Sequence, residues 1–437
     1  ESLTYMHRSV QINSLDAESH NNYGVSLQEL GRLDEAEKCF KQAIILEPKY
    51  IEAIKNLGNT FKDQGNLDKA IIPYKKAISI NPDDAEAHYN MGVALKLLGK
   101  LEEAIASYNQ AIELNPEYAE AHQNLGLTLL NSGKIKEGLD ECEWRWKTAY
   151  GLSKQRNFLQ PMWDGITSLK NKKILLWCEQ GIGDTMNWSS CLPFVTSLSK
   201  QCIVECQEKL IPLLRRSFPN VEIRTENRCL DSERDDFDLH LPMGSLYKHF
   251  IDKIMQNTQP DAFLVPDPKR VKFWRKRLRS VGKSPYIGIS WKSSVLSPSR
   301  LEHYPSISEW SPVLKVPDVT FINLQYTDYA NDIAKIQDEF GVTVHNFEDI
   351  DQFNNIDDVA ALSAALDMVV STKITPPFIS SAVGTSTKIA NWRQSSYNNI
   401  LTNPVTSSYQ MFERNTWEPW DNVFNLIAEV IFKLTKN

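Results

Sequence analysis

The stretch from Glu179 to Thr185, EQGIGDT, is the first place in the chain where residue types and spacing point to chemistry. It follows KKILLWC, an apolar run typical of a buried strand. Glycine has no Cβ, so a turn that contains Gly181 and Gly183 lets backbone N–H groups approach a substrate at the start of a helix. Asp184 then either faces that substrate or caps a helix that begins at Thr185. The elements around the turn must decide between these two roles.

The composition indicates a globular chain of two or three domains. Its 437 residues are 42% hydrophobic and 24% charged, with a formal net charge of −7. A pI of about 5.7 gives no reason to expect nucleic acid as a partner. No apolar run reaches about 18 residues, so we expect no membrane span. The seven scattered cysteines, with no histidine or second pair near Cys202 and Cys206, predict a reduced cytoplasmic protein without a metal site.

A 34-residue period dominates the first third of the chain. Glycine recurs at Gly24, Gly58, Gly92 and Gly126, and the same register places alanines (Ala36, Ala70, Ala104), aromatic residues (Phe40, Tyr74, Tyr108) and prolines (Pro48, Pro82, Pro116). Small residues let two antiparallel helices approach, the aromatic ring fills the gap to the next hairpin, and proline ends the second helix. The pattern is similar to the tetratricopeptide repeat. It predicts full copies over 17–50, 51–84 and 85–118, a capping copy over 119–150 and a partial repeat over 1–16.

The two ends of this array depart from the pattern. In the fourth copy Gly138 and Cys142 replace the alanine and the aromatic residue, so we expect a capping helix that turns Trp144 and Trp146 onto a neighbouring domain. Residues 1–16 fit the second half of a repeat, and we therefore expect further repeats upstream.

One asparagine per repeat precedes the residue before the periodic glycine: Asn22, Asn56, Asn90 and Asn124. The concave face of stacked hairpins commonly takes up an extended peptide or a helix, so we expect a protein or peptide partner in this groove. Two interpretations of the asparagines stay open. They form a ladder of amides that pairs with a peptide backbone, or each one satisfies a neighbouring turn.

After about residue 165 the period changes to short apolar runs separated by helical stretches. The runs are KILLWC, QCIVEC, DLHLP, YIGISW, VTFINLQY, DMVVS and TKIANW. Strands that alternate with helices predict βαβ units and mostly parallel sheets. We expect a connector over 151–169 and two Rossmann-like lobes, over 170–264 and 265–437. Ligands in such folds bind beyond the carboxyl ends of the strands.

These segments, in their order along the chain, resemble bacterial proteins that join tetratricopeptide repeats to a GT-B glycosyltransferase. The motifs are MWDG, KKILLWCEQGIGDTMNWSSCLP, IGISWKSS, RLEHYPSISEWSPVL, TFINLQY, DIDQFNNIDDVAALSAALDMVVST and SSAVGTST. The catalytic part resembles the ADP-heptose:lipopolysaccharide heptosyltransferases of glycosyltransferase family 9. The resemblance implies an α-helical solenoid followed by an α/β GT-B region, with the acceptor in the first lobe and a nucleotide sugar in the second. It implies sugar transfer with the nucleotide sugar as co-substrate and with no metal or other cofactor.

The resemblance also assigns roles to residues. It makes Asp184 the base that accepts the acceptor's proton, with Gln180, Gly181 and Gly183 beside the acceptor. For the diphosphate it favours Lys292, with Ser293 and Arg300 nearby, because lysine and arginine bind phosphate oxygens. Gln325 ends the strand TFINLQ, where the nucleoside should rest. The donor site is completed by the strand end and helix start after DMVVS: Ser371, Thr372 and Thr375.

One segment departs from the family's pattern. Many relatives carry a histidine where this chain has Phe378, and Pro376-Pro377 precede it in KITPPFISSAVGT. Phenylalanine cannot donate a hydrogen bond, so the sugar contact of that histidine is lost or replaced. Two alternatives therefore stay open: a non-catalytic scaffold with a degenerate GT-B body, or a transferase that acts on a lipid-linked saccharide. By analogy with related bacterial fusions, flagellin or another surface protein is a candidate acceptor.

Overall fold

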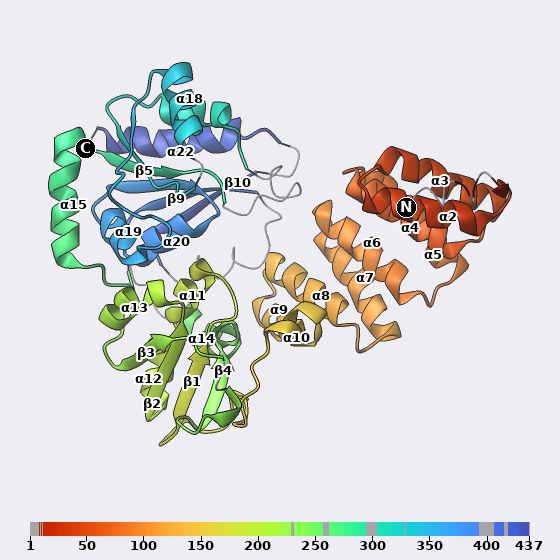
Figure 1. The fold of residues 1–437 in the computed structure, drawn as a ribbon, viewed down its shortest axis with the longest axis horizontal. Coiled ribbons are helices and arrows are strands. Elements are labelled where there is room, and N and C mark those ends of the chain that lie inside the picture. Colours follow the sequence, from red (N-terminus) through yellow and green to blue (C-terminus); the bar gives the residue numbers. More distant parts are fainter. Residues whose placement is uncertain are drawn as a thin grey trace. The chain divides into compact units, whose positions relative to one another are not determined.

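The computed structural model divides the chain into two compact units, Glu1–Ser153 (unit 1) and Lys154–Asn437 (unit 2) (Figure 1). The structure describes residues 8, 10, 12–228, 231–256, 262–293, 304–327, 329–392, 406–414 and 418–436. No helix among these residues is both long and apolar enough to cross a membrane.

Unit 1 consists of helices packed in antiparallel pairs (Figure 1). The helices are α2 (Ala17–Glu29), α3 (Leu33–Leu46), α4 (Ile51–Asp63), α5 (Leu67–Ile80), α6 (Ala85–Leu97), α7 (Leu101–Leu114), α8 (Ala119–Asn131), α9 (Ile135–Cys142), η1 (Glu143–Lys147) and α10 (Ala149–Lys154). Each pair up to α8–α9 turns on a glycine with φ between 74° and 86°, a conformation that residues with a side chain rarely adopt. The predicted helical repeats are therefore present.

The periodic glycines have a packing reason. A Cβ atom on Gly58 would lie 2.6 Å from Cε1 of Tyr74, and one on Gly24 or Gly92 would meet Phe40 or Tyr108 at 2.7 Å. The three aromatic rings are fully buried. Glycine on the first helix of each pair therefore makes room for the aromatic ring on the second, and the sequence period records this contact.

In the capping copy, the Trp144 ring stacks on His122 of α8, with ring centroids 3.7 Å apart and planes 1° apart. His122 is held in place because its Nδ1 contacts Glu141 Oε2 at 2.6 Å and its Nε2 contacts the Pro116 carbonyl at 3.0 Å. Trp144 therefore has a ring partner within unit 1, and the packing of Trp144 and Trp146 on a neighbouring domain stays a prediction.

In the described part of unit 2, the first sheet has four parallel strands in the order β3-β2-β1-β4. The strands are β1 (Lys173–Trp177), β2 (Gln201–Cys206), β3 (Val221–Thr225) and β4 (Leu239–Pro242). The helices between and after them are α11 (Ile182–Ser189), α12 (Leu192–Leu198), η2 (Glu208–Leu210), α13 (Ile211–Ser217), η3 (Asp231–Glu233), η4 (Met243–Ser245) and α14 (Leu246–Gln256). β1 is a nearly continuous apolar run because helices cover both faces of a parallel sheet.

The second sheet has six described strands, also parallel, in the order β10-β9-β8-β5-β6-β7. They are β5 (Tyr286–Ser290), β6 (Thr320–Asn323), β7 (Val344–His345), β8 (Met368–Thr372), β9 (Thr387–Trp392) and β10 (Tyr409–Arg414). The accompanying helices are α15 (Pro268–Val281), η5 (Ile307–Trp310), α17 (Ser311–Leu314), α18 (Ala330–Phe340), α19 (Ile356–Ser363), α20 (Thr375–Ala382) and α22 (Asp421–Leu434). The predicted α/β architecture with parallel sheets is confirmed.

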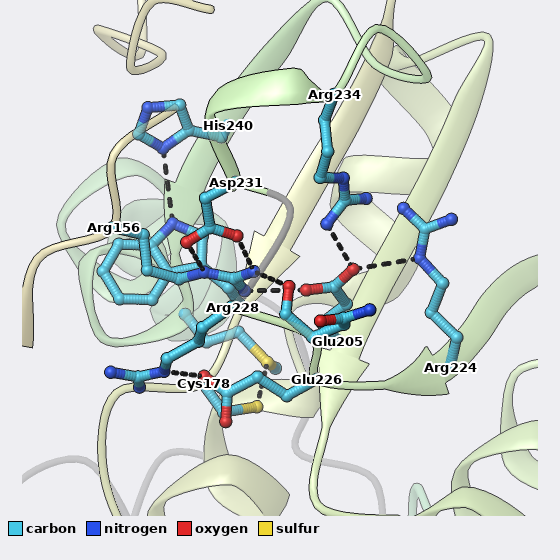
Figure 2. A network of polar contacts seen from close by, with 12 residues as sticks. Arg156, Cys178, Glu205, Arg224, Glu226, Arg228, Asp231, Arg234 and His240 are labelled. Atoms are coloured by element: carbon cyan, nitrogen blue, oxygen red, sulfur yellow. Dashed lines mark hydrogen bonds and ion pairs between the residues drawn. The ribbon is translucent and has the colours of Figure 1, made fainter. Parts of the chain in front are cut away.

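Residues 154–169, where we predicted a connector, pack into unit 2 through Arg156 (Figure 2). The fully buried Arg156 guanidinium donates to Asp231 Oδ2 at 2.9 Å, to Glu205 Oε2 at 2.7 Å and to the Asn227 carbonyl at 3.0 Å. The other oxygen of Glu205 accepts from Arg224 at 3.1 Å and Arg234 at 2.5 Å. This Arg156 cluster fastens the start of unit 2 to its first sheet.

The two units differ in charge. Residues 1–153 contain 23 acidic and 16 basic residues, so they account for the formal net charge of −7 of the whole chain. Unit 2 is formally neutral by the same count.

Candidate functional site

A pocket of about 260 Å³ lies in unit 2 where strands of both sheets end. Its lining includes residues that follow β1, β2, β6 and β8 (Gly181, Gln207, Leu324 and Thr375). Ligands of parallel α/β folds bind at the carboxyl edge of the strands, because the loops there are free of the sheet. We call this site the cleft pocket.

Three α-helices begin at the cleft pocket: α11 at Ile182, α19 at Ile356 and α20 at Thr375. Gly181 is the N-cap of α11 and Thr375 is the first residue of α20, and both line the pocket together with Ile182 and Pro376. The first N–H groups of a helix lack partners within the helix and carry partial positive charge. Pro376 and Pro377 have no N–H and are accepted in a first turn, so Thr375 alone among the first three residues of α20 keeps a backbone N–H. The arrangement suits an anion such as a phosphate group.

Lys209 of η2 brings a formal positive charge to the same pocket. Its Nζ donates to the Phe353 carbonyl at 3.0 Å and lies 4.2 Å from the centroid of the Phe353 ring. Burial lowers the pKa of Lys209, and Asp351 opposes that shift. An ammonium group has three donors, so the bond to Phe353 leaves capacity for a ligand.

The remaining walls suit a flat ring. The rings of Tyr326 and Phe353 lie 6.2 Å apart, and Leu324, Ile356, Val359 and Ile379 supply apolar surface. Gln352 Nε2 donates to the Asn323 carbonyl at 3.0 Å, which fixes the amide. Gln352 Oε1 is buried and has no hydrogen-bond partner among the described residues. A heterocycle that carries an N–H donor would satisfy it.

Three charged side chains that do not line the pocket interact electrostatically. Lys373, between β8 and α20, interacts electrostatically with Asp184 of α11 and Glu413 of β10. Burial lowers the pKa of Lys373 to about 7, and the two carboxylates oppose this shift. Glu413 is also held by Asn391, whose Nδ2 donates to Oε1 at 2.9 Å. Asp184 and Glu413 therefore favour the charged form of Lys373, and burial disfavours it.

Phe378 accounts for the close approach of α11 and α20. A Cβ atom on Gly183 would lie 3.0 Å from Cδ2 of Phe378, and the Phe378 ring stacks on Tyr409 with centroids 6.3 Å apart. Phe378 is buried. Phe378, which stands where the family that the chain resembles carries a histidine, therefore packs between α11 and α20, and a side chain at position 183 would crowd that contact.

Lys292 and Gln325 lie together but are engaged with the protein. Lys292 Nζ pairs with Asp332 of α18 at 2.7 Å. Gln325 is fully buried; its Oε1 accepts from the backbone N–H groups of Trp291 and Lys292, and its Nε2 donates to the Lys292 carbonyl at 2.8 Å. Gln325 thus shapes the turn after β5, and neither residue lines the cleft pocket.

The other predicted donor residues divide into two groups. Ser371 and Thr372 are buried, and their hydroxyls bond Ser290 Oγ at 2.7 Å and the Trp291 carbonyl at 3.0 Å, whereas Thr375 lines the pocket. Ser293 follows Lys292, and Arg300 lies outside the described residues. On the acceptor side Gly181 lines the pocket and Gln180 is exposed beside it. In the described part of the chain, no group of three or more His, Cys, Asp or Glu could hold a metal ion.

The asparagines of unit 1 connect neighbouring repeats. Asn56 Nδ2 donates to Asn21 Oδ1 at 3.0 Å, and Asn124 Nδ2 donates to the Tyr89 hydroxyl at 3.2 Å. Asn90 is buried, and Asn22 is exposed and accepts a long 3.4 Å bond from Asn21. At two of the four positions the amide therefore bonds a side chain of the preceding repeat, a contact that neither interpretation described, and pairing with a peptide backbone stays a prediction.

Sequence reasoning missed Lys373, Lys209 and the Gln352-Phe353 pair. Lys373 directly follows the strand end DMVVST, so its position past a buried strand was the available signal. Lys209 lies in the short helix η2 and Phe353 in a turn, and neither belongs to a recognisable motif. Only the fold brings these residues, 144 apart in sequence, into hydrogen-bond contact.

Comparison with known families identifies the class of unit 1. Residues 17–50 match the family model described as "Tetratricopeptide repeat", and residues 58–99 and 94–133 match the one described as "TPR repeat". The predicted tetratricopeptide repeats are confirmed. Such arrays are protein-interaction scaffolds, so unit 1 has the architecture of a partner-binding module.

The chain is also similar to Protein FlbA of Caulobacter vibrioides, at 31% identity over 276 residues. The similarity covers 59% of this chain, more than unit 1 contains, and thus extends into unit 2. The chain spans less than half of that relative, 46% of its length.

Among solved structures, the crystal structure of MamA matches with a TM-score of 0.32 and 21% identity, covering 35% of this chain and 90% of that one. YrrB, described as a TPR protein with an unusual peptide-binding site, matches with a TM-score of 0.30 and 22% identity, covering 33% and 74%. TTC0263, described as a thermophilic TPR protein in Thermus thermophilus, matches with a TM-score of 0.30 and 25% identity, covering 34% and 81%.

Proposed function

We propose that unit 2 is a metal-independent glycosyltransferase that uses a nucleotide sugar, and that the repeats of unit 1 bind its protein acceptor. One observation carries the proposal. A single pocket at the carboxyl ends of both parallel sheets combines helix N-termini, a lysine and an aromatic pair. Phosphate suits the first two features, and a nucleobase suits the third. The order of motifs along the chain, which resembles repeat-fused GT-B enzymes, supports the same function.

The chemistry requires few groups. The acceptor's hydroxyl oxygen attacks the anomeric carbon, a carbon–oxygen bond forms, and the bond from that carbon to the diphosphate oxygen breaks. Asp184 takes the acceptor's proton. Helix N–H groups and nearby lysines stabilise the charge that develops on the nucleoside diphosphate as it leaves. All of these groups come from the protein, so the proposed mechanism needs no bound metal.

A protein acceptor is favoured because a repeat groove raises the local concentration of a docked polypeptide. Flagellin or another surface protein is the acceptor we propose from related bacterial fusions. The compartment we propose is the cytoplasm, since the six described cysteines are free and such thiols persist under reducing conditions.

The test is a ligand screen on the full chain. We expect one of UDP, GDP, ADP, CDP and dTDP, or its sugar, to raise the apparent stability by about 2.7 kcal/mol at a concentration of 100 Kd. Phe353→Ala should weaken that ligand about tenfold, since the ring lines the cleft pocket. Phe273→Ala is the matched control, because that ring is similarly exposed but lies on α15.

The second candidate function is a scaffold without turnover. Phe378, packed between Gly183 and Tyr409, favours it, because a phenylalanine offers no hydrogen bond to a sugar. Failure of every nucleotide to bind, combined with partner capture through the repeats, would establish the scaffold and exclude the transferase.

A further inference from the structure

We propose that the outer side of α15 binds an anionic lipid surface and holds unit 2 against it. The binding surface is a cluster of exposed cations, and none of them lines the cleft pocket. Its role therefore does not depend on the proposed transfer reaction. The five cations, which we call the basic face, are Lys272, Arg275, Lys276, Arg279 and Lys283.

The composition of α15 differs from that of the rest of the chain. Its 14 residues include seven lysines and arginines and no acidic residue, whereas the whole chain has a formal net charge of −7. Unit 2 is formally neutral, so the charge of α15 is a local concentration and not part of a basic domain. Nucleic-acid binding usually comes with a strongly basic domain, and nucleic acid is therefore the less favoured partner.

Two of the seven cations are used within unit 2. Arg270 donates to Asp358 Oδ2 at 2.6 Å, and Arg277 pairs with Asp349. Trp274 is fully buried and donates from Nε1 to Asp358 Oδ1 at 2.8 Å. These contacts fix α15 on unit 2 and determine which side of the helix faces outward.

The basic face lies on the outward side. Successive residues of an α-helix are rotated by about 100°, so Lys272, Lys276 and Arg279 fall opposite the buried Trp274. All five cations are exposed, and no ion pair joins any of them to another residue of the described part of the chain. Figure 1 shows α15 along the outer edge of unit 2. Two turns of helix, about 10 Å, thus present cations that no carboxylate of the described residues neutralises.

This surface suits lipid headgroups better than a folded protein. Anionic headgroups move within the membrane plane and can gather around exposed lysines and arginines. A protein partner requires an apolar interface core with aromatic anchors that fill pockets. The only exposed aromatic residue of α15, Phe273, is already engaged: its ring centroid lies 5.1 Å from that of Trp274 and 4.2 Å from Cζ of Arg270. The observations therefore favour a lipid surface as the partner.

The attachment is electrostatic. The apolar side of α15 is packed within unit 2, so the helix rests on the headgroups and does not insert into the hydrocarbon. Each exposed cation near an anionic membrane then strengthens binding about fivefold. Salt weakens such binding, because the Debye length falls from about 10 Å at about 0.1 M to about 3 Å at about 1 M.

The experiment is flotation of the full chain with lipid vesicles, made of phosphatidylcholine alone or mixed with phosphatidylglycerol. At about 0.1 M salt we expect binding only to the vesicles that contain phosphatidylglycerol, and release at about 1 M salt. The triple variant Lys272→Gln, Lys276→Gln and Arg279→Gln should bind these vesicles roughly 100-fold more weakly.

Two further variants separate charge from folding. Lys272→Arg with Lys276→Arg keeps the charge of the basic face and should bind as the wild type does. Lys69→Gln, Lys75→Gln and Lys76→Gln together remove the same net charge from exposed positions of α5 in unit 1. This matched control should leave vesicle binding within about twofold of wild type, because α5 does not belong to the basic face.

The proposal is overturned if the wild-type chain does not bind anionic vesicles, binds neutral vesicles equally well, or keeps its binding in the triple variant of α15. Fluorescence anisotropy with a short DNA duplex and a short single-stranded RNA, at the same salt, tests the other polyanion. Nucleic-acid binding that the triple variant loses, without vesicle binding, would assign the basic face to nucleic acid and overturn the lipid proposal.

Discussion

Asp184 is the residue on which turnover depends in the proposed reaction. Asp184→Asn removes the base but keeps the size of the side chain and the position of the helix. We expect a fall of about 10²–10⁴ in kcat with nucleotide affinity within a few-fold of wild type. Transfer assays and nucleotide titration on the same preparation give both values. Asp338→Asn, an exposed carboxylate on α18, is the control, and equal losses in both variants would contradict a role for Asp184 as the base.

Lys373 should also make the stability of the folded chain depend on pH. Its folded pKa of about 7 lies below the ordinary value of 10.5, so between these values the unfolded chain holds a proton that the folded chain has released. The contribution of Lys373 to the stability of the folded chain therefore rises with pH across this window. Lys373→Met removes this pH-dependent contribution. The melting temperature of the variant should therefore exceed that of the wild type most near pH 6, and the difference should shrink toward pH 10. Differential scanning calorimetry measures this, with exposed Lys276→Met on α15 as control.

The third prediction for a single residue concerns Arg156 and the cluster around it. Arg156→Met leaves the buried carboxylates of Asp231 and Glu205 without their main partner, and should cost about 3–5 kcal/mol in the free energy of unfolding. Arg228→Met removes an exposed pair with Glu226 and should cost no more than about 1 kcal/mol. Urea unfolding of both variants decides the matter, and similar values would show that the cluster is not stabilising.

At the scale of elements, each repeat depends on one glycine–aromatic contact. Gly58→Ala improves intrinsic helix propensity by about 1 kcal/mol, yet the new methyl group would lie 2.6 Å from the fully buried Tyr74 ring. We expect a net loss of about 1–3 kcal/mol from overpacking. Lys69→Ala on the exposed face of α5 should stay within about 0.5 kcal/mol of wild type. Net stabilisation by Gly58→Ala would mean that α4 and α5 can separate at little cost.

The helices and strands also show how much of the fold and of the candidate site could be predicted from the sequence. The 34-residue period and the apolar runs identify the repeats and seven strands, because buried helix faces and buried strands leave a local pattern. β3, β7 and β10 escaped prediction: β3 alternates charged and apolar residues, β7 has two residues, and β10 is half exposed. The Gly181 turn and Thr375 were predictable because a strand end followed by a helix start is local. Lys209 and Phe353 were not, since a contact between residues far apart in the sequence has no local signature.

At the scale of the whole molecule, two separate cores should unfold separately. Gly58→Ala should lower only the transition of unit 1, and a bound nucleotide should raise only the transition of unit 2, because a ligand stabilises the cooperative unit that binds it. Scanning calorimetry of wild type and variant, with and without nucleotide, tests this. A single transition that both perturbations move would show that the units fold as one.

The periodic contact between glycine and aromatic ring has a consequence for inheritance. Gly24, Gly58 and Gly92 each meet their ring at nearly the same distance, so the repeats are interchangeable parts. An in-frame duplication or loss of one copy joins surfaces that already fit. Such an event changes the length of the groove in a single generation and leaves the residues of the cleft pocket untouched. Lineages can thus vary which partner is held while the chemistry beside it is kept.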